Sequence, residues 1–161
     1  MTNQELKTTI KEELKKAGFK KGYTISVKDC LYSTSMKIKI NDPTINRKEI
    51  EKIAHKFQEI DRDERTGEIL SGGNCYVFVE YKEGIFEEVA REYEATAKGA
   101  MMSKDVTTKI FDGLYLINWE HSGNLEIRQQ NEKDYRTFKV YDLKQLSEFI
   151  YKFAKFGTIA A

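Results

Sequence analysis

The sequence predicts an α+β fold in which mostly antiparallel sheet packs with helices. The first observation is composition: 40 % of the 161 residues are hydrophobic and 12 % are aromatic, which suffices for a buried core. The second is strict alternation of apolar and polar residues in neighbouring runs, which is typical of half-buried strands. The third is apolar spacing of three and four residues in the flanking runs, which indicates amphipathic helices. Together they predict the order α-β-β-α-β-α-β-β-β-α.

The first helix is predicted over residues 3–17. Leu6, Ile10 and Leu14 recur on one helical face, and Thr2 or Asn3 can cap the start of the helix. Gly18 then favours the left-handed conformation in which helices end.

An antiparallel pair of strands follows, over residues 23–28 and 35–40, joined around Asp29 to Ser33. In each strand apolar residues alternate with Thr, Ser and Lys, so one face is predicted to be buried and the other polar. That polar face is open to water or to a partner.

A turn through Pro43 leads to a second helix, for which Asn46 and Glu49 form a capping-box pattern. The run Cys75 to Tyr81 is apolar at both alternating sets of positions. Because a strand covered on both faces has this composition, the run predicts a central strand.

The second half of the chain predicts a helix from Gly84 to about Met102, three strands and a closing helix. The strands are expected at residues 115–119, 125–129 and 135–141, and the last helix at 143–156. We therefore expect two parts: an αββαβ unit at residues 1–83, and an αβββα extension at residues 84–161 that packs with it.

The formal charge of +1 hides a strong segregation along the chain. Residues 1–41 contain nine lysines and four acidic residues. Residues 42–100 contain nine basic and fourteen acidic residues, and residues 101–161 contain nine basic and eight acidic residues.

The apolar runs are too short to span a membrane, and the polar N-terminus does not resemble a signal peptide. With only two cysteines, the sequence predicts a protein of a reducing cytoplasm.

Five segments of the first half carry a resemblance to a known family. They are the helix Ile10–Lys16, the strand Tyr23–Lys28, the strand and turn Ser35–Thr44, the helix Ile50–Phe57 and the strand Tyr76–Val79. In this order they resemble the large polyvalent protein-associated domains, type 29, of phages and conjugative elements. The family's turn reads Asp-Gly-Pro-Thr, whereas here Asp42 directly precedes Pro43.

The resemblance implies a context and offers no catalytic residues. Such domains belong to mobile elements, in polyvalent proteins that protect incoming DNA or subdue host defences. It therefore implies a small counter-defence protein in the cytoplasm of a host cell, an anti-CRISPR-like inhibitor that binds a host effector.

Catalytic and metal-binding patterns are weak in the sequence. His55 and His121 are isolated, and Cys30 and Cys75 have no zinc-ligand spacing. Glu126, with Asp112 upstream, is only a faint match to the carboxylates of a metal-dependent nuclease. We expect no enzyme activity, no metal and no cofactor.

Two surfaces are candidates for binding. The first is acidic and would contact a host defence protein or its nucleic-acid complex, through Asp61, Asp63, Glu64, Glu80, Glu83, Glu87 and Glu94. A merely solvated helix face explains the same residues. The second is the lysine-rich first hairpin, which would give a weak nucleic-acid contact through Lys20, Lys21, Lys28, Lys37 and Lys39.

Lysines on an outer strand also protect a sheet edge from aggregation, which is the alternative explanation for the second surface. Tyr135 and Tyr151 are expected at the surface as interface anchors. No membrane contact is expected, and a homodimer is compatible with the sequence.

Overall fold

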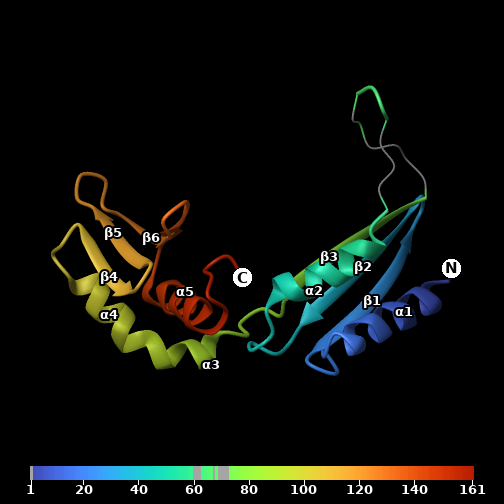
Figure 1. Cartoon of the computed structure of the whole chain (residues 1–161), viewed down its shortest axis with the longest axis horizontal. Helices are drawn as coiled ribbons and strands as arrows, with labels where there is room; N and C mark the ends of the chain where they lie inside the picture. Colours follow the sequence, from blue (N-terminus) through green and yellow to red (C-terminus); the bar gives the residue numbers. More distant parts are fainter. Residues whose placement is uncertain (1, 60–62, 67, 69–72) are drawn as a thin grey trace. The chain divides into compact units, whose positions relative to one another are not determined.

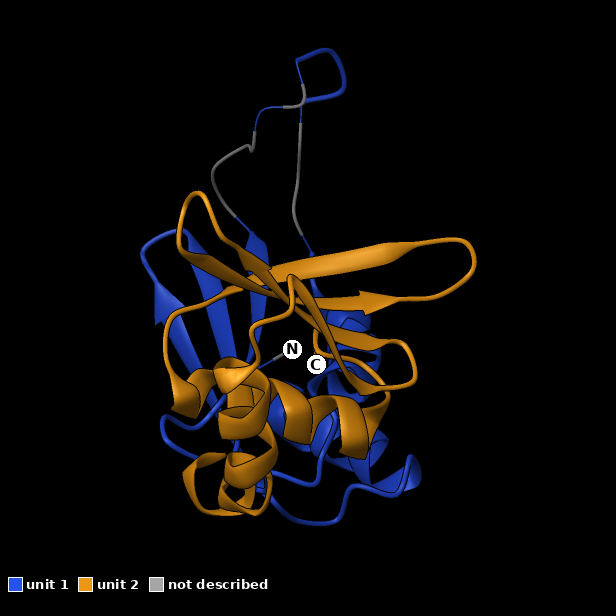
Figure 2. Cartoon of the chain, turned by 90° about the vertical axis from the view of Figure 1, so that its left-hand side faces the viewer, with its two compact units in different colours: residues 1–85 blue, residues 86–161 orange. Residues whose placement is uncertain are grey.

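The computed structural model describes residues 2–59, 63–66, 68 and 73–161. The chain forms two compact units, unit 1 (residues 1–85) and unit 2 (residues 86–161) (Figure 2). Each unit combines helices with its own sheet, so the predicted α+β class is confirmed. The division lies two residues beyond the expected one.

The described residues of unit 1 form a three-stranded sheet and two helices (Figure 1). In chain order its elements are α1 (Asn3–Lys16), β1 (Tyr23–Cys30), β2 (Ser33–Ile40), α2 (Arg47–Ala54), the 3-10 turn η1 (His55–Phe57) and β3 (Asn74–Tyr81). β2 is the central strand, antiparallel to β1 and parallel to β3. The prediction that residues 75–81 form a central strand is therefore wrong, because β3 lies at the sheet edge.

The predicted helix boundaries of unit 1 follow from local hydrogen bonds. Thr2 Oγ1 accepts from the Glu5 amide at 3.2 Å, and Glu5 Oε2 accepts from the Thr2 amide at 2.7 Å. Gly18, with φ of 99°, follows the end of α1. Asn46 Oδ1 accepts from the Lys48 amide at 3.0 Å and so starts α2, whereas the expected capping box would have used the Glu49 amide.

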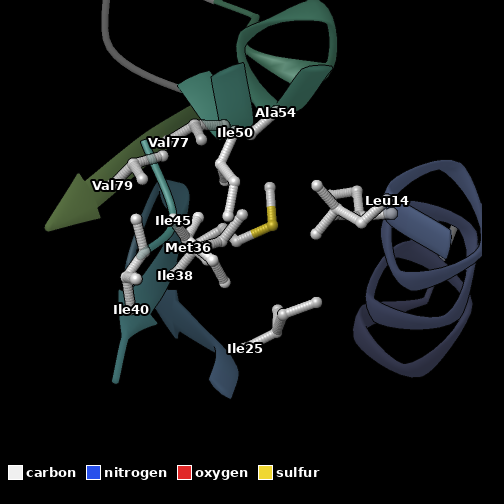
Figure 3. Packing of buried hydrophobic residues seen from close by; sticks show 11 residues of the cluster. Leu14, Ile25, Met36, Ile38, Ile40, Ile45, Ile50, Ala54, Val77 and Val79 are labelled. Atoms are coloured by element: carbon white, nitrogen blue, oxygen red, sulfur yellow. The ribbon is translucent and has the colours of Figure 1, made fainter. Parts of the chain in front are cut away.

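The core of unit 1 lies between the sheet and its helices. Figure 3 shows Leu14 of α1 and Ile50 of α2 directed toward Met36 of β2, all of which are fully buried. Ile25 and Val79 extend the same cluster onto β1 and β3. Because both helices contribute to one cluster, they cover the same face of the sheet.

Unit 2 is a four-stranded antiparallel sheet in the order β4-β5-β6-β7, packed with helices. Its elements are α3 (Glu87–Ala90), the 3-10 turn η2 (Arg91–Tyr93), α4 (Glu94–Met102), β4 (Thr107–Phe111), β5 (Leu114–Trp119), β6 (Asn124–Gln130), β7 (Tyr135–Val140) and α5 (Leu143–Phe156). The helix expected over 84–102 is thus interrupted at residues 91–93, and β4 is a strand that the sequence reasoning missed.

The core of unit 2 joins α4 and α5 to one face of this sheet. Leu116, Ile127 and Val140 of the strands pack with Leu146 and Ile150 of α5. Tyr151 is also buried, with its ring 5.8 Å from that of Phe86 and 6.3 Å from that of Tyr93. It is therefore not the exposed anchor that the sequence suggested, whereas Tyr135 is 62 % exposed.

None of the helices in the described part of the chain has both the length and the apolar character that crossing a bilayer requires.

Candidate nucleic-acid interface

The polar face of the unit 1 sheet is the first candidate site. Side chains alternate between the two faces of a strand, and α1 and α2 cover the face that carries Met36 and Ile38. The opposite face, here called open face 1, carries Thr24, Ser26 and Lys28 of β1, Ser35, Lys37 and Lys39 of β2, and Tyr76, Phe78 and Glu80 of β3.

The strand register arranges these nine side chains in three rows. The rows are Thr24–Lys39–Glu80, Ser26–Lys37–Phe78 and Lys28–Ser35–Tyr76. Neighbours in a row are about 4.8 Å apart and successive rows about 7 Å apart, as strand geometry requires. Lysines, hydroxyl groups and aromatic rings therefore lie side by side on one surface.

Glu80 is the only acidic residue in these rows, and it pairs with both lysines of β2. Its Oε1 lies 3.4 Å from Lys37 Nζ and 4.0 Å from Lys39 Nζ. The three side chains are each about half exposed, so the pairs are weak and easily exchanged for another anion. Lys28 has no ion pair in the described part of the chain.

The sequence wrongly predicts the surroundings of the two aromatic residues that β3 contributes to open face 1. Phe78 was expected to be buried in a central strand but is 51 % exposed. Tyr76 is half-buried and accepts a 3.3 Å hydrogen bond from Asn74 Nδ2. Open face 1 is therefore both basic and aromatic, and the aromatic half comes from the β3 run that sequence reasoning assigned to the core.

Lys20 and Lys21, the remaining predicted lysines, are exposed in the loop between α1 and β1. That loop enters β1 at the end of the sheet where Thr24, Lys39 and Glu80 form a row. These two lysines add positive charge beside the sheet without belonging to its rows.

The predicted acidic surface is divided between the two units. Glu80 and Glu83 belong to unit 1, whereas Glu87 and Glu94 belong to unit 2. The Glu87 carboxylate accepts a hydrogen bond from Lys144, which lowers the pKa of Glu87. With Glu80 also paired, the residues of this set do not form a single unpaired acidic patch within either unit.

The remaining acidic candidates lie around the loop that precedes β3. Asp63 Oδ1 accepts from the amides of Thr66 and Arg65 at 2.9 and 2.8 Å, and these hydrogen bonds lower the pKa of Asp63. Its carboxylate therefore holds a turn. Glu64 is exposed, and Asp61 lies outside the described residues.

The candidate catalytic residues are dispersed. His55 is exposed in η1 and His121 is exposed in the β5–β6 turn, one in each unit. Asp112 is 97 % exposed and lies 2.6 Å from Lys109, whereas Glu126 lies on β6 opposite Lys139. In the described part of the chain, no group of three or more His, Cys, Asp or Glu could hold a metal ion.

A cavity of about 580 Å³ lies in unit 1, at the end of the sheet where β1 turns into β2. One part of its polar wall is already hydrogen-bonded: the Asp29 carboxylate accepts from Asn3 Nδ2 at 2.7 Å and from Thr34 Oγ1 at 3.2 Å. Cys75 also lines it, and burial raises the pKa of this thiol. Lys56 and Glu59 also line it, and because their charges are of opposite sign the cavity favours neither an anion nor a cation, which makes it a weaker site than open face 1.

Comparisons of the chain with protein-family models, with curated proteins and with solved structures find no match in any of the three. The resemblance to the polyvalent protein-associated domains therefore stays a prediction from the residues that carry it.

Proposed function

We propose that the protein is a non-catalytic binding protein whose unit 1 binds single-stranded nucleic acid on open face 1. The observation that supports this proposal is the placement of Lys28, Lys37 and Lys39 beside Tyr76 and Phe78 on a sheet face that the helices of unit 1 leave uncovered. Basic side chains and exposed rings are the two components by which proteins bind single strands.

Each component has a separate role in binding. The lysines neutralise phosphates, and the rings of Tyr76 and Phe78, about 7 Å apart on one strand, stack on unpaired bases. Duplex DNA keeps its bases paired and stacked, so its bases cannot reach these rings. We therefore expect a preference for single strands over duplexes.

The charge of the face sets the expected salt dependence. Three lysines and one glutamate give open face 1 a net charge of about +2, and each neutralised phosphate of a single strand contributes about −0.7 to the slope of log K against log salt. The slope should therefore be about −1.4. Because no arginine is present on this face, binding is expected to be weak and insensitive to base sequence.

The test is fluorescence anisotropy of a labelled oligo-deoxythymidine of about 20 nucleotides at low salt. Phe78→Ala should weaken binding about five- to 150-fold, because stacking is worth about 1–3 kcal/mol per base. Lys28→Ala should weaken binding and lower the magnitude of the salt slope by about 0.7.

The matched control is Lys11→Ala, which removes the same charge from the exposed side of α1, on the covered side of the sheet. Equal effects of Lys28→Ala and Lys11→Ala would mean that the attraction is diffuse and that open face 1 is not the site. No binding by the folded wild-type protein would reject the proposal.

The second candidate function is inhibition of a host defence effector by a phage or other mobile-element protein, in the manner of anti-CRISPR proteins. It rests on the family resemblance and on Glu64, Glu83 and Glu94, which are exposed and have no ion pair among the described residues. Such carboxylates could oppose the basic groove of a nuclease in the host cytoplasm.

Pull-down against candidate nuclease effectors, followed by a cleavage assay, tests this second candidate. Reduced cleavage that is restored by Glu83→Gln and Glu94→Gln would support it. Unchanged cleavage by every effector tested would count against it.

A further inference from the structure

Unit 2 also has a sheet face that its own helices leave uncovered. Leu116 and Ile127 face α4 and α5, so the residues that alternate with them point the other way. This surface, here called open face 2, carries Thr107 and Lys109 of β4, Tyr115, Ile117 and Trp119 of β5, Glu126 and Arg128 of β6, and Tyr135, Thr137 and Lys139 of β7.

The register brings the rings and cations of open face 2 together. Tyr115 lies between Lys109 on one side and Arg128 on the other, in directly paired positions. Trp119 lies four residues further along β5, about 14 Å from Tyr115, and is 45 % exposed. Tyr115 and Trp119 point to the same side of the sheet, and Ile117, which is buried, separates them.

Arg128 is held in place by an aromatic ring. Its guanidinium carbon lies 5.1 Å from the centroid of the Tyr135 ring. Its Nε has no hydrogen-bond partner among the described residues, and the guanidinium makes no ion pair there. The guanidinium is thus fixed by stacking, and its charge is not compensated by a carboxylate.

We infer that open face 2 is a second binding site for single-stranded nucleic acid, with bases stacked on Trp119 and Tyr115 and phosphates held by Arg128 and Lys139. Charge complementarity favours this occupant: the face carries Lys109, Arg128 and Lys139 against the single carboxylate of Glu126, with Asp112 pairing to Lys109 from the adjacent turn. Arginine also recognises phosphate in two-point contacts, which open face 1 lacks.

This inference rests on the proposed function in one respect, namely that the same class of ligand contacts both units. Because one chain carries both sites, a strand that reaches both binds the second at high effective concentration. The chain would then bind long single strands more tightly than open face 1 alone allows.

Trp119 makes the inference testable, since it is the single tryptophan of the chain. A base stacked on its ring quenches the fluorescence, so titration of the full chain with oligo-deoxythymidine should lower emission and reach saturation. Arg128→Gln should weaken this quenching at least fivefold, whereas Lys155→Gln, an equal charge change at the exposed end of α5, should leave it unchanged.

Variants of the two faces distinguish the inference from the proposed function. Phe78→Ala should leave saturable quenching of Trp119, because it alters open face 1 only. Another outcome is that anisotropy reports binding while the oligonucleotide leaves Trp119 emission unchanged and Trp119→Ala leaves the affinity unchanged. In that case open face 2 is not a site and the proposed function stands. If Trp119 is quenched while Phe78→Ala and Lys28→Ala have no effect, open face 2 is the site and the proposed function fails.

A protein partner is the competing occupant, because Trp, Tyr and Arg are also enriched in protein interfaces. If oligo-deoxythymidine leaves Trp119 emission unchanged but a co-purified host protein shifts it, the inference is overturned in favour of a protein interface. If Trp119→Phe keeps the affinity measured by anisotropy while Trp119→Ala lowers it at least fivefold, the stacking role is supported.

Discussion

Replacing Glu80 by Gln should tighten the binding of single-stranded nucleic acid to open face 1. The carboxylate lies 3.4 Å from Lys37 Nζ and 4.0 Å from Lys39 Nζ, so it competes with phosphate for two of the three lysines of the face. The amide keeps the size of the side chain and removes the negative charge. The sign of the effect is therefore opposite to that of a lysine variant.

The expected size follows from these distances. Half-exposed ion pairs are worth about 0.2–1 kcal/mol each, and a phosphate about 6 Å from the carboxylate adds a repulsion of about 0.7 kcal/mol in water, which salt reduces further. A gain of about 1 kcal/mol corresponds to about fivefold in Kd. The net charge of the face rises to about +3, so the salt slope should steepen by about 0.7.

Anisotropy with labelled oligo-deoxythymidine at several salt concentrations measures both quantities. Glu83→Gln is the matched control, because it removes the same charge from an exposed turn beyond β3 and should change Kd by less than about twofold. Loss of the two ion pairs should lower the free energy of unfolding by at most about 1 kcal/mol. This upper limit corresponds to a decrease in Tm of about 2–4 °C. If folded Glu80→Gln binds the oligonucleotide no more tightly than the wild-type protein, the reasoning is refuted. If Glu80→Gln instead inhibits an effector less than the wild-type protein does, the acidic surface is favoured.

Three further outcomes concern the fold itself. Burial raises the pKa of Glu148, so the ionised carboxylate destabilises the folded state at neutral pH. Glu148→Gln should therefore raise Tm at about pH 7. The gain in Tm should vanish below about pH 4, where the carboxyl is protonated in the unfolded state as well. Gly22→Ala should lower the free energy of unfolding by more than about 2 kcal/mol in urea denaturation, because φ is 94° and the added Cβ would lie 2.8 Å from two side-chain atoms. Gly18→Ala, with φ of 99° but open space around it, should cost only about 1–2 kcal/mol; an equal loss in both variants would contradict the steric explanation. Thiol labelling of the native protein should modify exposed Cys30 before Cys75, whose pKa is raised by burial, and Cys30→Ser should abolish the fast phase; a fast phase that persists would show that Cys75 is accessible.

Much of the fold is local in origin and could be predicted from the sequence. Thr2 with Glu5, and Asn46 with Lys48, are hydrogen-bonded within three residues, so the helix starts depend on neighbours that the sequence displays. The first hairpin was equally accessible, because its buried and exposed residues alternate without interruption from Thr24 to Val27 and from Met36 to Ile40.

The missed strand β4 lacks that regularity. The pairing of β4 with β5 shifts between Lys109 and Phe111, so the apolar residues of the strand fall out of strict alternation. The position of β3 in the sheet also could not be predicted from the residues of β3. Aromatic residues on both faces of β3 suggest a buried strand, but pairing with β2 on one side only leaves Phe78 at the surface.

The candidate site could be predicted only in part for the same reason. Lys28, Lys37 and Lys39 share a face through the period of their own strands, which the sequence shows directly. Their neighbours Tyr76 and Phe78 arrive by a parallel pairing across more than thirty residues of chain, and register at that separation is not encoded locally.

The edge position of β3 has a consequence for self-association. Sheet edges invite pairing with a second chain, and a homodimer formed by strand addition would use such an edge. The outer side of β3 is partly occupied: the backbone of Glu59 exchanges two hydrogen bonds with Cys75, and Gln58 Oε1 accepts from the Val77 amide at 3.2 Å. A partner strand must therefore add beyond Val77, along Phe78–Tyr81, a stretch shorter than the usual strand of about five or six residues. Gln58 and Glu59 therefore limit strand addition at the β3 edge of the sheet.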